Sequence, residues 1–485
     1  MAVSTEREVV ERVPKGALIN GKWIETGKTL PVIDPSTGEA LCEITDAGTP
    51  EALAALDAAC AAQASWAATA PRDRGEILRS VYEVMTERAD ELALLMTLEM
   101  GKPLSESKAE IAYAADFFRW FSEEAVRIHG RYAEMTNGQG RVLTMKHPIG
   151  PCVLVTPWNF PAAMATRKLG PAIAAGCTMI LKPAKETPLS AFALAQALMD
   201  AGLPDGVLNI VVGSSASKIV GPLLEDPRVR KLSFTGSTEV GRMLIEQSAK
   251  NVLTVSMELG GNAPFIVYDD ADLDAAVDGA MLAKMRNNGE ACTAANRFHV
   301  HESVATEFSE KLAARMGDMK VGRGSDESVK VGPLINEDQR QIVAELVDDA
   351  VAKGAEPLTG GKAIDGEGFF YPPTVLADVP KDARVLSEEI FGPVAPIATF
   401  STEEEAIAAA NLTEYGLVAY VYTRDLGRAF RTIEKLETGM VGLNRGVVSN
   451  PASPFGGVKQ SGFGREGGFE GIEEYLELKY VGMDF

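Results

Sequence analysis

The chain has 485 residues, which corresponds to two to four domains at the usual size of about 100–200 residues each. Hydrophobic residues make up 46% of the sequence and charged residues 24%, a composition that indicates a folded globular protein rather than a disordered one. With 47 Lys and Arg against 68 Asp and Glu, the net charge is −21, which excludes nucleic acid and anionic membranes as main partners.

The N-terminal segment is charged and lacks the apolar core of a signal peptide, and no run of about 20 apolar residues occurs in the sequence. We therefore expect a cytoplasmic protein. The 5 cysteines are scattered and form no Cys-x-x-Cys pair, which argues against a disulfide framework and against a zinc site. The pair His299 and His301 is more typical of one surface of a strand than of metal ligands, so we expect no metal.

In chain order, apolar residues first recur every three or four positions between Pro50 and about Ile128, which predicts several helices. Residues 130–147 are poor in helix formers, and apolar and polar residues alternate over residues 141–146. This segment predicts a hairpin or a protruding arm, although a simple connecting loop fits the sequence about equally well.

After Gly150, short apolar runs alternate with amphipathic segments. The runs predict strands over residues 152–156, 177–181, 208–212 and 231–234, and the amphipathic segments predict helices over residues 162–175, 190–201, 216–224 and 239–250. Such alternation implies a parallel sheet with right-handed crossovers, hence an α/β, doubly wound domain of the dinucleotide-binding type. A strand over residues 253–258 is stopped by Gly260-Gly261, the predicted domain boundary, and a second α/β region follows to about Leu436.

Asn159 lies in the motif Thr156-Pro-Trp-Asn-Phe-Pro161, directly after the first parallel strand, where open α/β sheets place their ligands. Its amide and the positive end of the next helix are both suited to stabilise a developing oxyanion. Capping of that helix is the commoner role for an Asn in this position, so both roles stay open.

Lys182 and Lys185 follow the next strand. Their ammonium groups either bind the ribose and phosphate of a nucleotide or lie solvated at the surface, which is the usual fate of lysine. The turn over residues 234–241 offers small residues before a helix, as a bound pyrophosphate requires, but it lacks the Gly-x-Gly-x-x-Gly fingerprint.

Cys292 lies among polar neighbours after a predicted helix that ends at Asn287-Asn-Gly289. A helical turn that began at this loop would lower the pKa of the thiol and make it a nucleophile, although its base would have to come from elsewhere in the fold. Cys152 and Cys177 are flanked by apolar residues instead, which indicates core side chains.

Together these segments resemble the aldehyde dehydrogenase superfamily over nearly the whole chain. The resemblance is carried by Thr156-Pro-Trp-Asn-Phe-Pro161, Lys182-Pro183, Phe234-Thr-Gly-Ser237, Met257-Glu-Leu-Gly-Gly-Asn262, Cys292, Glu388-Glu-Ile-Phe-Gly-Pro393 and Pro454-Phe-Gly-Gly457. It implies a Rossmann-type cofactor domain (residues 1–129 and 148–259), an α/β catalytic domain (260–453) and a small β oligomerisation arm (130–147 and 454–485). Such arms pair across subunits, so we expect a homodimer or homotetramer.

The resemblance implies that Cys292 is the nucleophile, that Glu258 is the general base, and that Asn159 and the Cys292 backbone N–H stabilise the oxyanion. Addition of the thiolate to an aldehyde, departure of a hydride to a nicotinamide and hydrolysis of the resulting thioester then give the acid.

For the cofactor, the resemblance places Trp158 and Ser237 near the pyrophosphate, Lys182 at the adenosine ribose, and Glu389 and Phe391 around the nicotinamide ribose. Lys185 stands where members that prefer NAD commonly have Glu. An ammonium attracts a 2′-phosphate and cannot accept a hydrogen bond from the 2′-hydroxyl, so we expect NADP ahead of NAD.

Within the superfamily the chain is most similar to succinate-semialdehyde dehydrogenases. Arg167, Arg286 and Ser449 match the residues that hold the substrate carboxylate, in a pocket framed by Phe160 and Phe455. The implied reaction is oxidation of succinate semialdehyde to succinate through a thiohemiacetal and a thioester. Glutarate- or 2-oxoglutarate-semialdehyde dehydrogenase and a cofactor-independent thiol esterase are the alternatives, and a non-catalytic binding protein is disfavoured because every chemical position holds a competent residue.

Two positions depart from the family pattern. Glu290 stands where most members have Gln, so a carboxylate two residues before Cys292 would oppose thiolate formation if it pointed inward. Ala294 stands where some relatives have a second cysteine, which excludes a local disulfide with Cys292.

Overall fold

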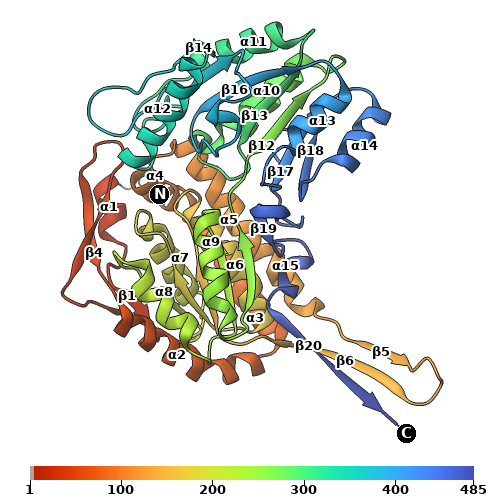
Figure 1. Cartoon of the computed structure of the whole chain (residues 1–485). Helices are drawn as coiled ribbons and strands as arrows, with labels where there is room; N and C mark the ends of the chain where they lie inside the picture. The colour runs from red at the N-terminus through yellow and green to blue at the C-terminus, as the bar shows by residue number, and fades with distance from the viewer. Residues whose placement is uncertain (1–4, 485) are drawn as a thin grey trace.

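Residues 5–484 are described by a computed structural model, and they form two large sheets, a three-stranded sheet and a two-stranded sheet. In Figure 1 the second large sheet and its helices occupy the top of the view, the first large sheet lies below them, and the three-stranded sheet extends away from the body at the lower right.

The first large sheet has the strand order β19-β11-β10-β7-β8-β9-β1-β2. Its parallel strands are β7 (Cys152–Val155), β8 (Met179–Lys182), β9 (Leu208–Ile210), β10 (Lys231–Thr235) and β11 (Thr254–Glu258); the antiparallel ones are β1 (Ala17–Ile19), β2 (Lys22–Ile24) and β19 (Gly462–Phe463). The crossover helices are α6 (Pro161–Ala175), α7 (Pro188–Asp200), α8 (Ala216–Glu225) and α9 (Thr238–Ala249). The predicted alternation of strands and helices is therefore confirmed, with ends shifted by one or two residues.

Helices from the N-terminal part of the chain cover both faces of this sheet. They are α1 (Glu6–Glu11), α2 (Thr49–Ala68), α3 (Pro71–Glu87), α4 (Ala89–Met100) and α5 (Leu104–Glu124). Because successive strand side chains point to opposite faces, Cys152 and Leu154 of β7 share one core with α3 to α7, whereas Val153 and Val155 share another with α2, α8 and α9. This packing fixes the loops at the carboxyl ends of the strands between layers of helices.

The second large sheet has the order β14-β15-β16-β13-β12-β17-β18. Its strands are β12 (Ala263–Val267), β13 (Ala295–His301), β14 (Glu356–Thr359), β15 (Thr374–Ala377), β16 (Val394–Phe400), β17 (Val418–Tyr422) and β18 (Met440–Leu443), all paired in parallel except β14. Its helices are α10 (Leu273–Met285), α11 (Ala305–Gly317), α12 (Glu337–Ala352), α13 (Glu403–Asn411) and α14 (Leu426–Lys435). The chain passes from β11 to β12 across Gly260 and Gly261.

The projecting sheet consists of β5 (Arg131–Glu134), β6 (Arg141–Pro148) and β20 (Leu476–Met483), and β6 pairs with both neighbours. Residues 130–147 thus form a hairpin rather than a simple loop. The prediction that all of residues 454–485 belong to this arm needs correction, because β19 pairs antiparallel with β11 in the first large sheet. The glycines of this stretch permit that approach: a Cβ at Gly462 would lie 1.9 Å from the Met257 carbonyl oxygen.

Shorter elements complete the described chain. The two-stranded sheet pairs β3 (Thr29–Ile33) with β4 (Ala40–Thr45), and α15 (Glu470–Glu473) precedes β20. Short 3₁₀ turns are η1 (Ala125–Arg127), η2 (Arg286–Gly289), η3 (Arg384–Leu386) and η4 (Lys459–Ser461). Across residues 5–484, no helix has the length and apolar character needed to cross a membrane.

Candidate active site

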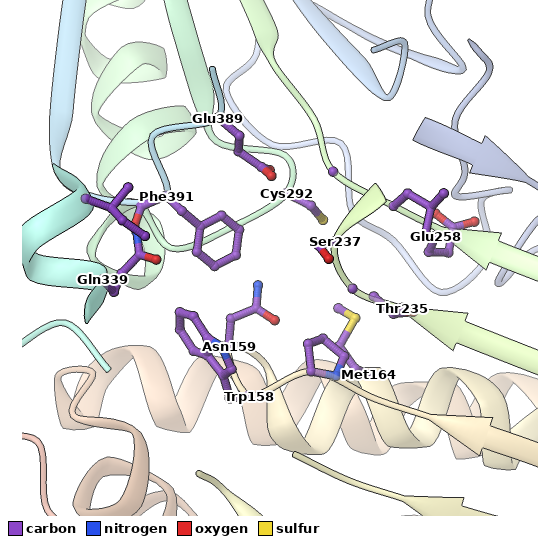
Figure 2. Close-up of a pocket in the computed structure, with 15 residues that line it drawn as sticks. Trp158, Asn159, Met164, Thr235, Ser237, Glu258, Cys292, Gln339, Glu389 and Phe391 are labelled. Carbon is purple, nitrogen blue, oxygen red and sulfur yellow. The ribbon is translucent and has the colours of Figure 1, made fainter. Parts of the chain in front are cut away.

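A cavity of about 270 Å³ opens at the carboxyl ends of β7, β10 and β11, which is where parallel α/β sheets bind their ligands. Figure 2 shows the side chains around it. The predicted catalytic and cofactor residues that line it are Asn159, Glu258, Cys292, Trp158, Ser237, Glu389 and Phe391. Residues from both large sheets therefore meet at one cavity.

A left-handed turn delivers Cys292 to this cavity. Asn287 and Asn288 both have φ of 56° and Gly289 has φ of 78°, so α10 ends before the Asn-Asn-Gly signal, as predicted. A Cβ at Gly289 would lie 2.2 Å from the Gly392 carbonyl oxygen, so this close approach of two backbones requires glycine.

The predicted lowering of the Cys292 pKa is wrong. The loop runs into strand β13 at Ala295 rather than into a helical turn. Burial raises the pKa of Cys292 to about 12; the nearby Arg167 charge opposes the rise, whereas Glu389 and Glu258 add to it. The thiol is therefore protonated at neutral pH and must lose its proton before it can attack.

Glu258 is the last residue of β11 and is 5% exposed, which rules out a solvated rim position. Burial raises its pKa well above 4.5, and the carboxylate of Glu466 raises it further. Burial also opposes ionisation of Glu466, but ion pairs with Lys168 (2.6 Å) and Arg167 (2.9 Å) hold the Glu466 pKa below its usual value. In this pair Glu466 is therefore the ionised carboxylate and Glu258 holds the proton.

The side chain of Asn159 turns to the loop that carries Cys292 rather than capping α6. Its Nδ2 donates to the Glu290 carbonyl oxygen at 3.0 Å. The first backbone amides of α6, at Ala162 and Ala163, donate to Glu110 Oε1 at 3.0 and 3.1 Å instead. The capping alternative is thus wrong, and the amide of Asn159 faces the cavity near Cys292 (Figure 2).

The predicted cofactor residues divide into two groups. Trp158, Ser237, Glu389 and Phe391 line the cavity, and the rings of Trp158 and Phe391 meet edge to face at 5.3 Å. Glu389 Oε1 accepts from the Gly261 N–H at 3.0 Å, and burial raises the Glu389 pKa to about 7. The carboxylate is therefore held in a fixed orientation.

Lys182 and Lys185 belong to the other group, outside the cavity lining. Lys182 ends β8 and is buried, which lowers its pKa. Lys185 has 54% of its side chain exposed and lies with Ser214 at a separate cavity, where its Nζ is 4.0 Å from Glu186. The cofactor roles of both lysines stay predictions.

The sequence did not indicate Gln339, although it lines the cavity from α12. Its Nε2 donates to the carbonyl oxygens of Ile390 and Phe391 at 3.2 and 3.0 Å, and Phe391 has the strained φ of 53°. Gln339 therefore holds the loop that presents Glu389 and Phe391. The pattern of apolar and polar residues in α12 is that of an ordinary surface helix, so no local pattern indicated this role.

Arg286, Ser449 and Phe160 come together near the nucleophile loop. Arg286 Nη1 donates to Ser449 Oγ at 3.5 Å, and the guanidinium carbon lies 4.8 Å from the centre of the Phe160 ring. Arg286 begins the turn that leads to Cys292, and it lines a small separate cavity with Thr293 and Tyr420 rather than the cavity at Cys292.

Arg167 differs from Arg286 because it is already paired. It is buried at 1% exposure, its Nε lies 2.9 Å from Glu466 Oε2, and its guanidinium carbon lies 3.8 Å from the centre of the Phe455 ring. Its Nη2 is buried and finds no hydrogen-bond partner among residues 5–484. Arg167 thus offers a buried and partly paired guanidinium rather than a free one.

Tyr113 of α5, which the sequence did not indicate, lies beside Arg286, with its ring centre 5.8 Å from the guanidinium carbon. Its hydroxyl is buried and, within the described part of the chain, has no hydrogen-bond partner. Burial raises the pKa of Tyr113, and the charges of Arg167 and Arg286 oppose the rise, which places the phenol near both arginines. An aromatic residue at helical spacing is typical of a core, so no pattern distinguished it.

Glu290 does not act as a charge on the nucleophile. Its side chain is buried, Oε1 accepts from the Ile335 N–H at 3.1 Å, and burial raises its pKa well above 4.5. Burial therefore favours the neutral form of the carboxyl, and only the backbone carbonyl of Glu290 faces Asn159. Cys152 and Cys177 are fully buried in the core, as predicted.

Comparison with known proteins agrees with this geometry. The profile of the aldehyde dehydrogenase family matches residues 23–481. The chain is 60% identical over 443 residues to a succinate-semialdehyde dehydrogenase of Paenarthrobacter nicotinovorans (91% of this chain, 98% of that protein) and 53% identical over 467 residues to a glutarate-semialdehyde dehydrogenase of Pseudomonas putida (96% and 97%). The crystal structure of an NADP-dependent enzyme of E. coli superimposes with a TM-score of 0.96 at 51% identity, covering 98% of each chain. The predicted fold class and resemblance are confirmed, and the chain belongs to the aldehyde dehydrogenase family.

Proposed function

We propose that this protein oxidises succinate semialdehyde to succinate with NAD(P). The observation that carries the choice of substrate is the pairing of Arg286 with Ser449 beside Phe160, at the start of the turn that leads to Cys292. A guanidinium and a hydroxyl beside an aromatic ring can bind the carboxylate of a short aldehyde acid. The relative that is 60% identical to this chain is named for this activity.

Cys292 is the proposed nucleophile. Once its thiol has lost its proton, the sulfur adds to the aldehyde carbon, and the Asn159 amide and the Cys292 N–H stabilise the alkoxide. A bound nicotinamide supplies the hydride acceptor, which leaves a thioester on Cys292. Glu258, once deprotonated, takes a proton from the water that hydrolyses this thioester.

The residues around the cavity fit a dinucleotide. Gly236, Ser237 and Gly260 give room for a backbone approach to phosphates, and the fixed carboxylate of Glu389 is an acceptor for ribose hydroxyls. Lys182 ends β8 and Lys185 lies just beyond it, where the exposed Lys185 ammonium suits a 2′-phosphate better than a free hydroxyl. NADP is therefore the proposed preference, in keeping with the NADP-dependent E. coli relative.

The proposed assembly is a homodimer or homotetramer. The arm of β5, β6 and β20 projects from the body (Figure 1), and the outer edges of such a small sheet offer backbone groups to a second subunit.

The test is a kcat/KM series, read by the absorbance of the reduced nicotinamide, over succinate semialdehyde, glutarate semialdehyde and an uncharged aldehyde of similar length. Succinate semialdehyde should be used best. A preference for glutarate semialdehyde, for which the 53% identical relative is named, would transfer the assignment to the longer acid. Ester hydrolysis without any cofactor reduction would favour a thiol esterase.

A further inference from the structure

Lys102 and Glu110 form a buried ion pair beneath the loop that carries Asn159. Their side chains are 0% and 1% exposed. Lys102 Nζ also donates to the Asn159 carbonyl oxygen at 2.7 Å and lies 4.3 Å from the centre of the Phe160 ring. Burying a charge pair costs free energy unless its hydrogen bonds are well satisfied. The position of this pair against an active-site loop therefore indicates that it stabilises the conformation of that loop.

Glu110 holds the segment that follows Asn159. One carboxylate oxygen accepts from Lys102, and the other accepts from the backbone N–H groups of Ala162 and Ala163 in the first turn of α6. A carboxylate at a helix N-terminus stabilises both these amides and the helix dipole. The ion pair therefore bonds the backbone on both sides of Phe160. Lys102 binds the Asn159 carbonyl oxygen, and Glu110 binds the N–H groups of Ala162 and Ala163.

The same Asn159 residue is tied to the nucleophile loop. Asn287 Nδ2 donates to the Asn159 carbonyl oxygen at 2.9 Å and to the Glu290 carbonyl oxygen at 2.8 Å. Asn159 Nδ2 donates to that Glu290 carbonyl as well. Lys102 and Asn287 thus donate to the same acceptor, the Asn159 carbonyl oxygen, and Asn287 also bonds the Glu290 carbonyl of the Cys292 loop.

We propose that Lys102 and Glu110 are positioning residues for the oxyanion site: they fix the Asn159 backbone so that its amide stays at the distance from Cys292 that an alkoxide requires. Neither residue touches the substrate. The inference rests on the proposed role of Asn159 as an oxyanion donor. Loss of such a donor costs about 10²–10³-fold in rate, and a displacement of about 1 Å can cost about 10²-fold.

The test measures the rate constant of the hydride burst in rapid mixing, at saturating aldehyde and cofactor, together with cofactor affinity. Asn159→Ala should slow the burst by about 10²-fold or more. Lys102→Met should slow it by about 10–100-fold and leave the cofactor Kd within about twofold, equally for charged and uncharged aldehydes. When Asn159 is already Ala, Lys102→Met should slow the burst by less than about twofold, because the two residues act as one unit.

Arg74→Met provides a matched control, since Arg74 is also a buried cation that donates to a carbonyl of α6, that of Ala174 at the far end of the helix. It should lower the thermal midpoint but keep the burst. If Lys102→Met does not fold, the burst of Glu110→Gln tests the proposal instead. The glutamine amide oxygen can still accept from the first amides of α6, but the charge that pairs with Lys102 is gone.

A normal burst in Lys102→Met, or in Glu110→Gln when only that variant folds, would overturn the proposal, as would a slowing equally large in the Asn159→Ala background. A normal burst in Asn159→Ala alone would instead remove Asn159 from the proposed mechanism, and the positioning role with it.

Discussion

Replacement of Arg286 by alanine should separate carboxylated from uncharged aldehydes. Among residues 5–484 the guanidinium makes one long hydrogen bond, to Ser449 at 3.5 Å, and lies over the Phe160 ring, so its other donors can reach a substrate carboxylate. A charged hydrogen bond contributes about 1.5–3 kcal/mol, and we take the lower half of that range because Arg286 is partly exposed. The expected loss is about 1.5–2 kcal/mol, or about 10–30-fold in kcat/KM for succinate semialdehyde.

An uncharged aldehyde of similar length is the internal control for this variant. It never contacts the guanidinium, so its kcat/KM should change by less than about threefold, whereas a disturbed nucleophile turn would slow both substrates alike. Arg286→Lys keeps the charge without the planar fork and should fall between the native protein and the alanine variant. Equal losses for the two aldehydes would refute a carboxylate contact at Arg286 and, with it, the preference for semialdehydes.

Three further changes give separate expectations. Cys292→Ala should abolish both the hydride burst and turnover while cofactor affinity, measured by titration, stays the same; residual turnover would place the nucleophile elsewhere. Lys185→Glu should lower the NADP to NAD ratio of kcat/KM by about fivefold, that is by about 1 kcal/mol, since this side chain is half exposed; an unchanged ratio would remove it from the 2′-phosphate site. Burial raises the folded-state pKa of Glu290 above its unfolded value, so the native protein loses stability as pH rises above about 4.5. Between about pH 5 and pH 9, the thermal midpoint of Glu290→Gln should therefore fall less than that of the native protein. Parallel curves for the two proteins would contradict a neutral buried carboxyl.

Local patterns were sufficient for the parts of this fold that depend on neighbours in sequence. The alternation of apolar runs and amphipathic segments predicted β7 to β11 and their helices, because each strand and each helix buries its own face. Asn287-Asn-Gly289 predicted the end of α10 for the same kind of reason. Asn159 could be proposed from its place at the end of a parallel strand, whereas only the family resemblance indicated Glu258.

Features that depend on distant partners could not be predicted in this way. The pairing of Arg167 with Glu466 joins α6 to the C-terminal stretch, and it leaves the predicted clamp with one free guanidinium rather than two. The raised pKa of Cys292 comes from burial between loops of both sheets. Tyr113 and Gln339 reach the site from helices whose patterns are those of ordinary core and surface helices.

Glu258→Gln offers the most direct measurement of covalent aldehyde oxidation at Cys292. Without its deacylation base, the variant should accumulate the thioester when mixed with succinate semialdehyde and NADP. We expect intact-protein and peptide mass spectrometry to find one succinyl group per chain, on Cys292, together with about one equivalent of reduced cofactor. Reduced cofactor without a succinyl group on Cys292, or a succinyl group on another residue, would contradict the proposed nucleophile and the proposed reaction.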